Sequence, residues 1–191
     1  MFTPILIALA LLALLALAFL VFVSLRPTNF RVARTAKILA PAAKVFVEVN
    51  DFHRWVAWSP YDKRDPLMKR TYDGPPQGVG ASYAWNGNQE VGEGRSTIIE
   101  SKEGELIRIK LDFVRPFAGT NTAEFNFQPE GNQTNVTWAL NGKYNMVSKT
   151  VGLFINMDKM IGGDFDQGLA NLKSVVEAQV RTTMESPLAT S

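Results

Sequence analysis

The clearest hydrophobic pattern in the chain lies between Ser148 and Val180. Apolar residues recur there every three or four positions, as on one face of an α-helix, and charged residues take the opposite face. Because an isolated amphipathic helix is marginal in water, this one needs an apolar surface to pack against. The apolar arc holds Phe154, Ile161, Phe165, Leu172 and Val176, and the charged face holds Lys159, Asp166, Lys173 and Glu177.

Segments that alternate apolar and polar residues, as half-buried strands do, supply that surface upstream. One strand, over 30–39, precedes two short helical segments at 40–49 and 51–60, with one more turn expected after Ser59. In the strand that starts at Val79, this residue is expected to share a face with Tyr83 and Trp85. Short turns join the later strands, as in an antiparallel meander. These strands are predicted near 68–72, 79–85, 90–100, 106–113, 120–128 and 134–144. This order of strands and helices predicts an α+β domain in which about seven antiparallel strands are covered by the C-terminal helix.

The N-terminal pattern is different, because Ile5 to Val23 is an unbroken apolar run. Its length, roughly 20 residues, matches a helix that crosses a bilayer. The alternative is a cleaved signal peptide, which would carry basic residues before the run, and the first four residues carry no charged side chain. A retained transmembrane anchor is therefore predicted. The basic residues that follow the run place the rest of the chain in the cytoplasm by the positive-inside rule. They are Arg26, Arg31, Arg34 and Lys37.

The length of 191 residues allows one ordinary domain besides this anchor. The predicted division is an anchor and linker over 1–29, a folded domain over 30–181 and a disordered tail over 182–191. A formal net charge of +2, from 20 basic and 18 acidic residues, is too balanced for a nucleic-acid surface.

Composition also limits the chemistry. The absence of cysteine excludes disulfides, thiolate catalysis and cysteine-bound metals. His53 is the single histidine, and no metal-binding or nucleophile motif accompanies it. We therefore predict no catalytic residue, no metal and no cofactor. An enzyme acting on an apolar substrate would have only Asp158, Tyr72 and Tyr83 to offer as ionisable groups.

Three stretches carry a resemblance to a known superfamily. They are ILAPAAKVFVEVNDFHRWVAWSP, GPPQGVGASYAWNG and MDKMIGGDFDQGLANLK. With the order of elements, they resemble the START-like, helix-grip (SRPBCC) superfamily, in particular its polyketide cyclase/dehydrase and lipid-transport members. The likeness covers Phe30 to about Val180. It implies a curved sheet that grips the C-terminal helix around an apolar cavity. Because that superfamily has no universal catalytic set, the resemblance implies no catalytic residues here.

Large aromatic residues of the predicted strands and helices are candidates to line such a cavity. The alternative is that these rings simply fill the core. Small residues between them, such as Ala81 and Ala123, favour open space. The predicted ligand-binding residues are Trp55, Trp58, Tyr83, Trp85, Phe113, Phe125, Trp138, Asp158, Ile161 and Phe165.

Asp158 is the polar member of this set. On an unbroken helix it would lie beside Phe165 and Ile161, where an unpaired carboxylate is costly. A break at the glycine pair Gly162 and Gly163 would instead turn it to solvent, and we favour that interpretation because paired glycines are a known cause of kinks.

These observations predict a single-pass membrane protein whose domain binds a small hydrophobic ligand, a lipid or isoprenoid-like molecule, taken from the bilayer. The predicted partners are the bilayer and this ligand. Two alternatives remain open. One is a cyclase or dehydratase acting on an apolar substrate, and the other is a scaffold module with a filled core.

Overall fold

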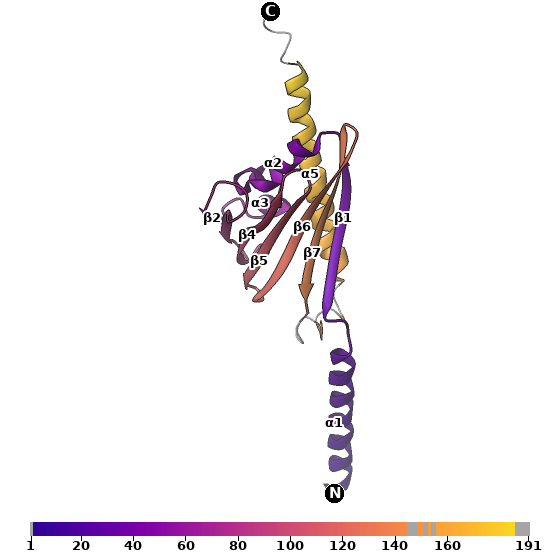
Figure 1. Ribbon diagram of the computed structural model, residues 1–191. Coiled ribbons are helices and arrows are strands. Elements are labelled where there is room, and N and C mark those ends of the chain that lie inside the picture. The colour runs from indigo at the N-terminus through magenta and orange to yellow at the C-terminus, as the bar shows by residue number, and fades with distance from the viewer. Residues whose placement is uncertain (1, 145–148, 151–152, 154–155, 186–191) are drawn as a thin grey trace, which may run out of the picture.

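The computed structural model describes residues 2–144, 149–150, 153 and 156–185 (Figure 1). The N-terminal half holds helix α1 (Phe2–Ser24), strand β1 (Asn29–Ile38), helix α2 (Ala42–Asn50), the 3-10 helix η1 (Phe52–Ala57), helix α3 (Pro60–Arg64) and strands β2 (Lys69–Asp73) and β3 (Ser82–Asn86). The C-terminal half holds strands β4 (Glu93–Lys102), β5 (Leu106–Arg115), β6 (Gly119–Glu130) and β7 (Gln133–Lys143), and helix α5 (Met157–Glu185).

All seven strands form one antiparallel sheet in the order β1-β7-β6-β5-β4-β3-β2. The sheet curves around α5, which runs along β1, while α2, η1 and α3 pack beside α5 on the same face of the sheet (Figure 1). This arrangement confirms the predicted α+β helix-grip fold. Because β1 pairs with β7, the first and last strands close the meander side by side.

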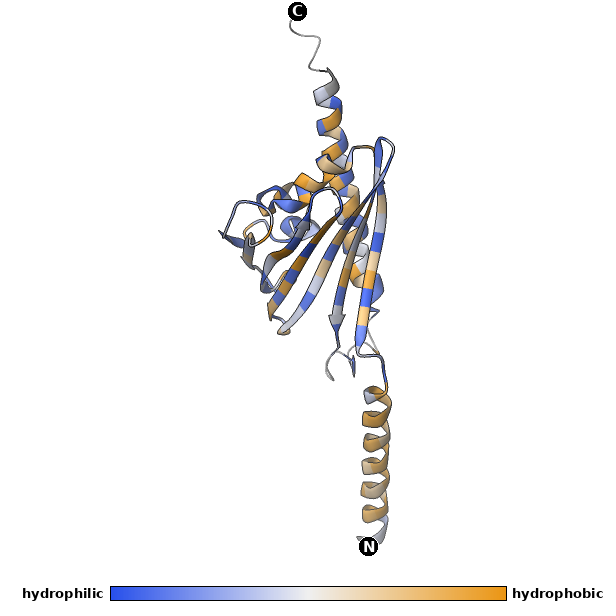
Figure 2. Ribbon diagram, viewed as in Figure 1, coloured by the Kyte–Doolittle hydropathy of each residue, from blue (hydrophilic) through white to orange (hydrophobic). Residues whose placement is uncertain are grey.

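The two faces of the sheet differ in polarity, as the alternating colours of the strands show (Figure 2). The outer face carries a ladder of ion pairs, in which Arg31 and Arg108 both contact Glu124, and Arg108 also contacts Glu100. Exposed pairs of this kind contribute little to stability. The inner face carries the apolar residues that meet the helices, and their burial supplies most of the driving force for folding.

Helix α5 buries the predicted apolar stripe. Phe165, Leu172 and Val176 are almost fully buried, together with Leu169. Of the predicted charged residues, Lys159 and Asp166 are exposed, whereas Lys173 and Glu177 are partly buried. The helix begins at Met157, and Phe154 lies outside the described residues. At its other end α5 continues through residues 182–185, which the sequence analysis assigned to the tail.

The predicted break at Gly162 and Gly163 is wrong, because α5 is continuous through both residues. Gly162 has a packing role instead. A side chain there would overlap the guanidinium of Arg34, whereas a Cβ at Gly163 would meet no atom within 4 Å. The first glycine therefore makes room for a side chain of β1, and the helix tolerates the second at a modest cost in propensity.

Val79 also departs from its prediction, because it is exposed and precedes the strand that begins at Ser82. Gly78 and Gly80 on either side of it have φ values of 78° and 90°. Only glycine adopts such values readily, so the chain turns at 78–80 and enters the sheet later than the alternation indicated.

Helix α1 is 23 residues long and is the one helix of the described residues long and apolar enough to cross a membrane. At 1.5 Å per residue it spans about 35 Å, close to the thickness of a bilayer core. Figure 2 shows it as a uniformly apolar rod that leaves one end of the domain. Its last turn contacts the domain, since Val23 is fully buried and Lys149 Nζ donates to the carbonyl oxygen of Ser24 at 3.1 Å.

Candidate ligand-binding site

Seven of the predicted ligand-binding residues lie in one buried aromatic cluster between the sheet and the helices. Phe165 of α5 stacks on Trp138 of β7, with ring centroids 4.1 Å apart, and Trp138 stacks on Phe125 of β6 at 4.9 Å. The sequence of contacts continues through Trp58, Trp55, Tyr83 and Trp85. We call these residues, together with Phe52, the aromatic cluster.

Two glycines, one on the sheet and one on α5, make room for rings of this cluster. The Trp85 ring lies on Gly94, and the Trp138 ring lies on Gly168, each within 2.6 Å of where a Cβ would be. The space that small residues leave is therefore taken by rings at these two positions, which agrees with a filled core in this part of the domain.

Most polar atoms of the cluster have partners. The indole nitrogens of Trp55 and Trp58 donate to the carbonyl oxygens of Val49 and Glu48 at 3.0 and 3.1 Å. Among the described residues, Trp138 Nε1 is the one fully buried side-chain polar atom without a hydrogen-bond partner. An unpaired buried donor costs about 1–3 kcal/mol, so this atom offers a hydrogen bond to an acceptor that reaches it.

The apolar inner face is less completely covered at the end of the sheet where α1 leaves the domain. Phe30 of β1, Leu111 and Phe113 of β5, and Ile161 of α5 pack against the hydrophobic core but are only partly buried. Two of these four residues, Phe113 and Ile161, belong to the predicted ligand-binding set. We call these four residues the open inner face.

The sheet divides beside this open inner face. Pairing between β6 and β7 ends at Thr122 and Asn141, whereas β5 still pairs with β6 as far as Gly119, and β1 still pairs with β7 as far as Lys143. Strands β6 and β7 therefore separate beyond Thr122 and Asn141, toward the end of the sheet where β1 begins. Residues 119–121 of β6 and 142–143 of β7 face each other without strand pairing, and the gap between them forms a fissure.

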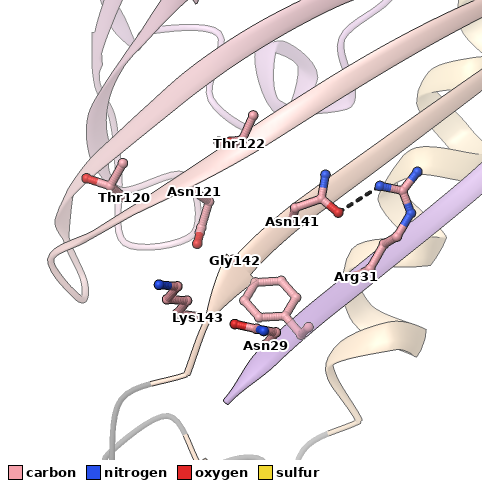
Figure 3. Close-up of a pocket in the computed structure, with 9 residues that line it drawn as sticks. Asn29, Arg31, Thr120, Asn121, Thr122, Asn141, Gly142 and Lys143 are labelled. Carbon is pink, nitrogen blue, oxygen red and sulfur yellow. Dashed lines mark hydrogen bonds between the residues drawn. The ribbon is translucent and has the colours of Figure 1, made fainter. Parts of the chain in front are cut away.

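The fissure has a volume of about 550 Å³ (Figure 3). Polar groups dominate its outer rim, where Arg31 Nη1 donates to Asn141 Oδ1 at 2.7 Å. Towards the interior, Gly142 accommodates the Phe30 ring and the Asn121 side chain, both of which a Cβ at this position would overlap. The remaining lining residues are Asn29, Thr120, Thr122 and Lys143.

Asp158 does not lie among the aromatic residues. Its side chain is 63% exposed and receives hydrogen bonds from Arg34, the closer at 3.0 Å. Hydrogen bonding to the Arg34 guanidinium lowers the pKa of Asp158. The residue faces solvent, as predicted, but because it lies in the first turn of α5, not because the helix breaks.

His53 lies at a second, smaller hollow of about 280 Å³ that Phe52, Tyr72 and Ser82 also line. Its ring stacks on Tyr72 at 4.1 Å, and its Nδ1 lies 2.9 Å from Asp51 Oδ1. The same carboxylate oxygen caps η1 by accepting from the His53 backbone N–H, which gives the pair a structural role.

The other ionisable groups considered for an enzyme are poorly placed for proton transfer at neutral pH. Burial, and then the charge of Asp62, raises the pKa of Tyr83, whose hydroxyl lies 4.0 Å from the Met68 sulfur. Burial also raises the pKa of Tyr72. Both phenols therefore stay protonated, and Asp62 is already paired with Arg70 at 2.6 Å.

Residues 29–177 match the family described as polyketide cyclase / dehydrase and lipid transport. The chain belongs to this family. Members of the polyketide cyclase/dehydrase and lipid transport family share a fold that typically binds hydrophobic ligands.

Solved structures support the fold of this family member. Protein CV1439 from Chromobacterium violaceum superposes with a TM-score of 0.56 at 16% identity, over 80% of this chain and 99% of that one. A protein from Nitrosospira multiformis superposes with a TM-score of 0.58 at 19% identity, over 80% of this chain and 99% of that one. DynU16, a protein in the dynemicin biosynthetic locus, superposes with a TM-score of 0.54 at 12% identity, over 77% of this chain and 47% of that one. A search of curated protein sequences finds no match.

Sequence reasoning missed the residues of the fissure. Phe30 and Leu111 lie on the inner face at ordinary alternating positions, and no pattern indicated that they would stay only partly buried. Asn121 and Gly142 gave no signal, because each occupies an ordinary alternating position of its strand. A fissure depends on where pairing between β6 and β7 ends, and strand register is set by the whole sheet.

Proposed function

We propose that this family member binds a small hydrophobic molecule, a lipid or an isoprenoid-like compound, that it takes from the bilayer in which α1 is anchored. One observation carries the proposal. The apolar inner face stays partly uncovered at the same end of the sheet where β6 and β7 separate and where α1 leaves the domain.

The fissure has a suitable size and polarity for an amphiphilic molecule. Ligand sites in proteins commonly enclose roughly 300–1,000 Å³, and the fissure falls within that range. Amide, hydroxyl and ammonium groups at its rim suit a polar head group. Phe30, which forms part of both the fissure and the open inner face, would receive the apolar part of the same molecule.

The linker favours this source of ligand. Only residues 25–28 separate α1 from β1, and four residues reach at most about 14 Å when fully extended. The fissure is thereby held close to the membrane, where hydrophobic molecules are concentrated, and tethering of this kind raises their effective concentration at the site.

The cytoplasmic side of the membrane is part of the proposal. Of the basic residues after the apolar run, Arg31, Arg34 and Lys37 form ion pairs within the domain. Arg26, in the linker, is the one that supports orientation most directly by the positive-inside rule.

Lipid retention tests this function with a matched pair of variants on α5. Ile161 is part of the open inner face, while its neighbour Met160 is exposed. The full chain is purified in lipid nanodiscs and transferred to detergent, and the lipids that remain bound are extracted and identified by mass spectrometry. We expect the wild type and Met160→Gln to retain the same enriched species, and Ile161→Gln to retain several-fold less. Absence of an enriched species in the wild type, or equal retention by both variants, would contradict the proposal.

A second candidate function is a scaffold module that binds no small molecule. The close stacking of the aromatic cluster favours it, because the central part of the core is filled with rings. On that account, contacts of Trp55, Trp58 or Phe125 with a ligand would require the rings to move. The retention experiment distinguishes the two candidates, since a scaffold module would carry no enriched lipid.

A further inference from the structure

We infer that the turn between β5 and β6 is a second point of contact between the domain and the bilayer. The inference rests on the membrane anchoring included in the proposed function and adds a specific surface to it. We call residues 114–118 the β5–β6 tip. It comprises Val114, Arg115, Pro116, Phe117 and Ala118.

Strand directions place this tip at the membrane end of the domain. Each of the pairs β5–β6, β6–β7 and β7–β1 is antiparallel, so β5 ends and β6 begins at the end of the sheet where β1 begins. Figure 1 shows the tip at the same end of the domain as the last turn of α1. The short linker keeps that end near the surface that α1 enters.

The tip exposes apolar side chains that the fold does not use. Phe117 is 67% exposed and Val114 is 56% exposed, and Leu25 in the linker is 80% exposed. Isolated exposed apolar residues are common on protein surfaces. These three, however, lie at the single end of the domain that a membrane anchor would bring to the lipid, where amphipathic and aromatic residues are favoured.

The turns at the opposite end of the sheet provide a contrast. The β4–β5 turn reads Lys102, Glu103, Gly104, Glu105, and the β6–β7 turn reads Glu130, Gly131, Asn132, Gln133. Both turns are polar, as expected for hairpins that project into water. The β3–β4 turn, residues 87–92, lies by strand direction at the same end as the tip, and it is mostly polar. The exposed apolar residues are therefore a local property of the β5–β6 tip and not of the hairpins in general.

The charge at this end also suits a bilayer surface. Arg26 and Lys143 are exposed there, and the tip's own Arg115 is paired with Glu93 at 2.9 Å, which neutralises that carboxylate. Exposed basic residues next to a membrane are attracted to anionic lipids. The occupant of this surface is thus a lipid bilayer.

Contact with the bilayer at both α1 and the β5–β6 tip would fix the orientation of the domain, which α1 alone would not. A single transmembrane helix leaves the domain free to rotate about the membrane normal and to tilt together with that helix. A second contact at the β5–β6 tip fixes the tilt, so that the fissure, whose wall on one side is β6, faces the lipid. The same surface that attaches the domain would therefore align the proposed binding site with its source of ligand.

Depth-dependent fluorescence quenching tests the contact, because the chain has no cysteine and one can be introduced at any chosen position. Full-length Ala118→Cys carries an environment-sensitive nitrobenzoxadiazole label beside an intact Phe117. It is reconstituted in vesicles of phosphatidylcholine and phosphatidylglycerol with nitroxide-labelled lipid. Glu103→Cys, at the opposite end of the sheet, is the matched control, and Leu12→Cys reports on α1.

We expect quenching at position 118 to be several-fold stronger than at position 103, and to fall towards that control when Phe117→Ser is added. Quenching at 118 that equals the value at 103, or that does not depend on Phe117, would overturn the inference. If position 12 is quenched in that case, the anchor stands and only the second contact fails. If position 12 is not quenched, the membrane anchoring in the proposed function fails as well.

Discussion

Two buried tryptophans at the centre of the domain differ in what their indole nitrogens contact. Trp58 Nε1 donates to the carbonyl oxygen of Glu48, and Trp138 Nε1 has no described acceptor. Both rings are nearly fully buried and both contact Phe125. The pair therefore separates the effect of an indole hydrogen bond from that of ring burial.

Replacing each tryptophan by phenylalanine should reveal this difference. We expect both Trp58→Phe and Trp138→Phe to destabilise the domain through lost ring volume, with Trp58→Phe costing about 1 kcal/mol more because it also breaks a hydrogen bond. Urea unfolding in detergent, followed by the remaining tryptophan fluorescence, measures the difference. An equal or larger cost at Trp138 would contradict this expectation and indicate that its N–H is bonded to a bound molecule or water.

Asp158 links the start of α5 to β1 by a charged contact whose strength depends on pH. Arg34 lowers the pKa of this carboxyl below its unfolded value of about 3.9. The stability that the contact contributes is then fully present above that pH and is lost as the pH falls through the lower, folded pKa.

The unfolding midpoint of the wild type should therefore fall more steeply below about pH 4 than that of Asp158→Asn, in which this group no longer titrates. At pH 6 and above, the difference between the two proteins should not change with pH. Urea titrations from pH 7 to pH 2.5 provide the comparison. Parallel curves for the two proteins throughout the acid range would show that the contact does not form.

At the scale of the element, α5 depends on two adjacent glycines with different surroundings. We expect Gly163→Ala to stabilise the domain by about 0.5–1 kcal/mol, because alanine is the better helix former and its Cβ meets nothing within 4 Å. We expect Gly162→Ala to lose that gain or to destabilise, because its Cβ would displace Arg34 from Asp158 and Asp166. Thermal unfolding followed by circular dichroism tests both variants, and an equal gain at the two positions would be inconsistent with the packing described here.

The elements also show which properties the sequence could predict. The alternation of apolar and polar residues predicted β1 and the strands from β4 onward. Each of these strands has one face in water and one in the core, and a repeat of two residues identifies such a strand. The same pattern wrongly placed Val79 in a strand, because the glycines on either side of it have positive φ values and turn the chain there. It also could not show that α5 remains continuous through Gly162 and Gly163, since the fit of Arg34 against the helix is a tertiary contact.

The candidate site was less predictable than the fold for a related reason. The aromatic residues could be assigned to the interior from their strand faces, and they do gather there. Whether such rings enclose space or fill it depends on how they pack. The space beside Gly94 and Gly168, for example, is filled by tryptophan rings. That Trp55, Trp58, Tyr83, Trp85, Phe113, Phe125, Trp138, Asp158, Ile161 and Phe165 contact a ligand stays a prediction.

At the scale of the whole molecule, several features coincide at one end of the domain. The apolar helix α1, the fissure, the open inner face and the β5–β6 tip all lie where β1 begins. The opposite end carries polar turns. This asymmetry is what a domain that works at a membrane surface requires, since one end must meet lipid while the other stays in water.

Photo-crosslinking from the bilayer tests the central claim most directly. The full chain is reconstituted in vesicles that contain a phosphatidylcholine with a diazirine in its acyl chain, irradiated, digested and mapped by mass spectrometry. If the domain draws hydrophobic molecules onto its inner face, adducts will form on the peptides that carry Phe30 and Ile161 as well as on α1. Adducts confined to α1, with both of these peptides unlabelled, would contradict the account.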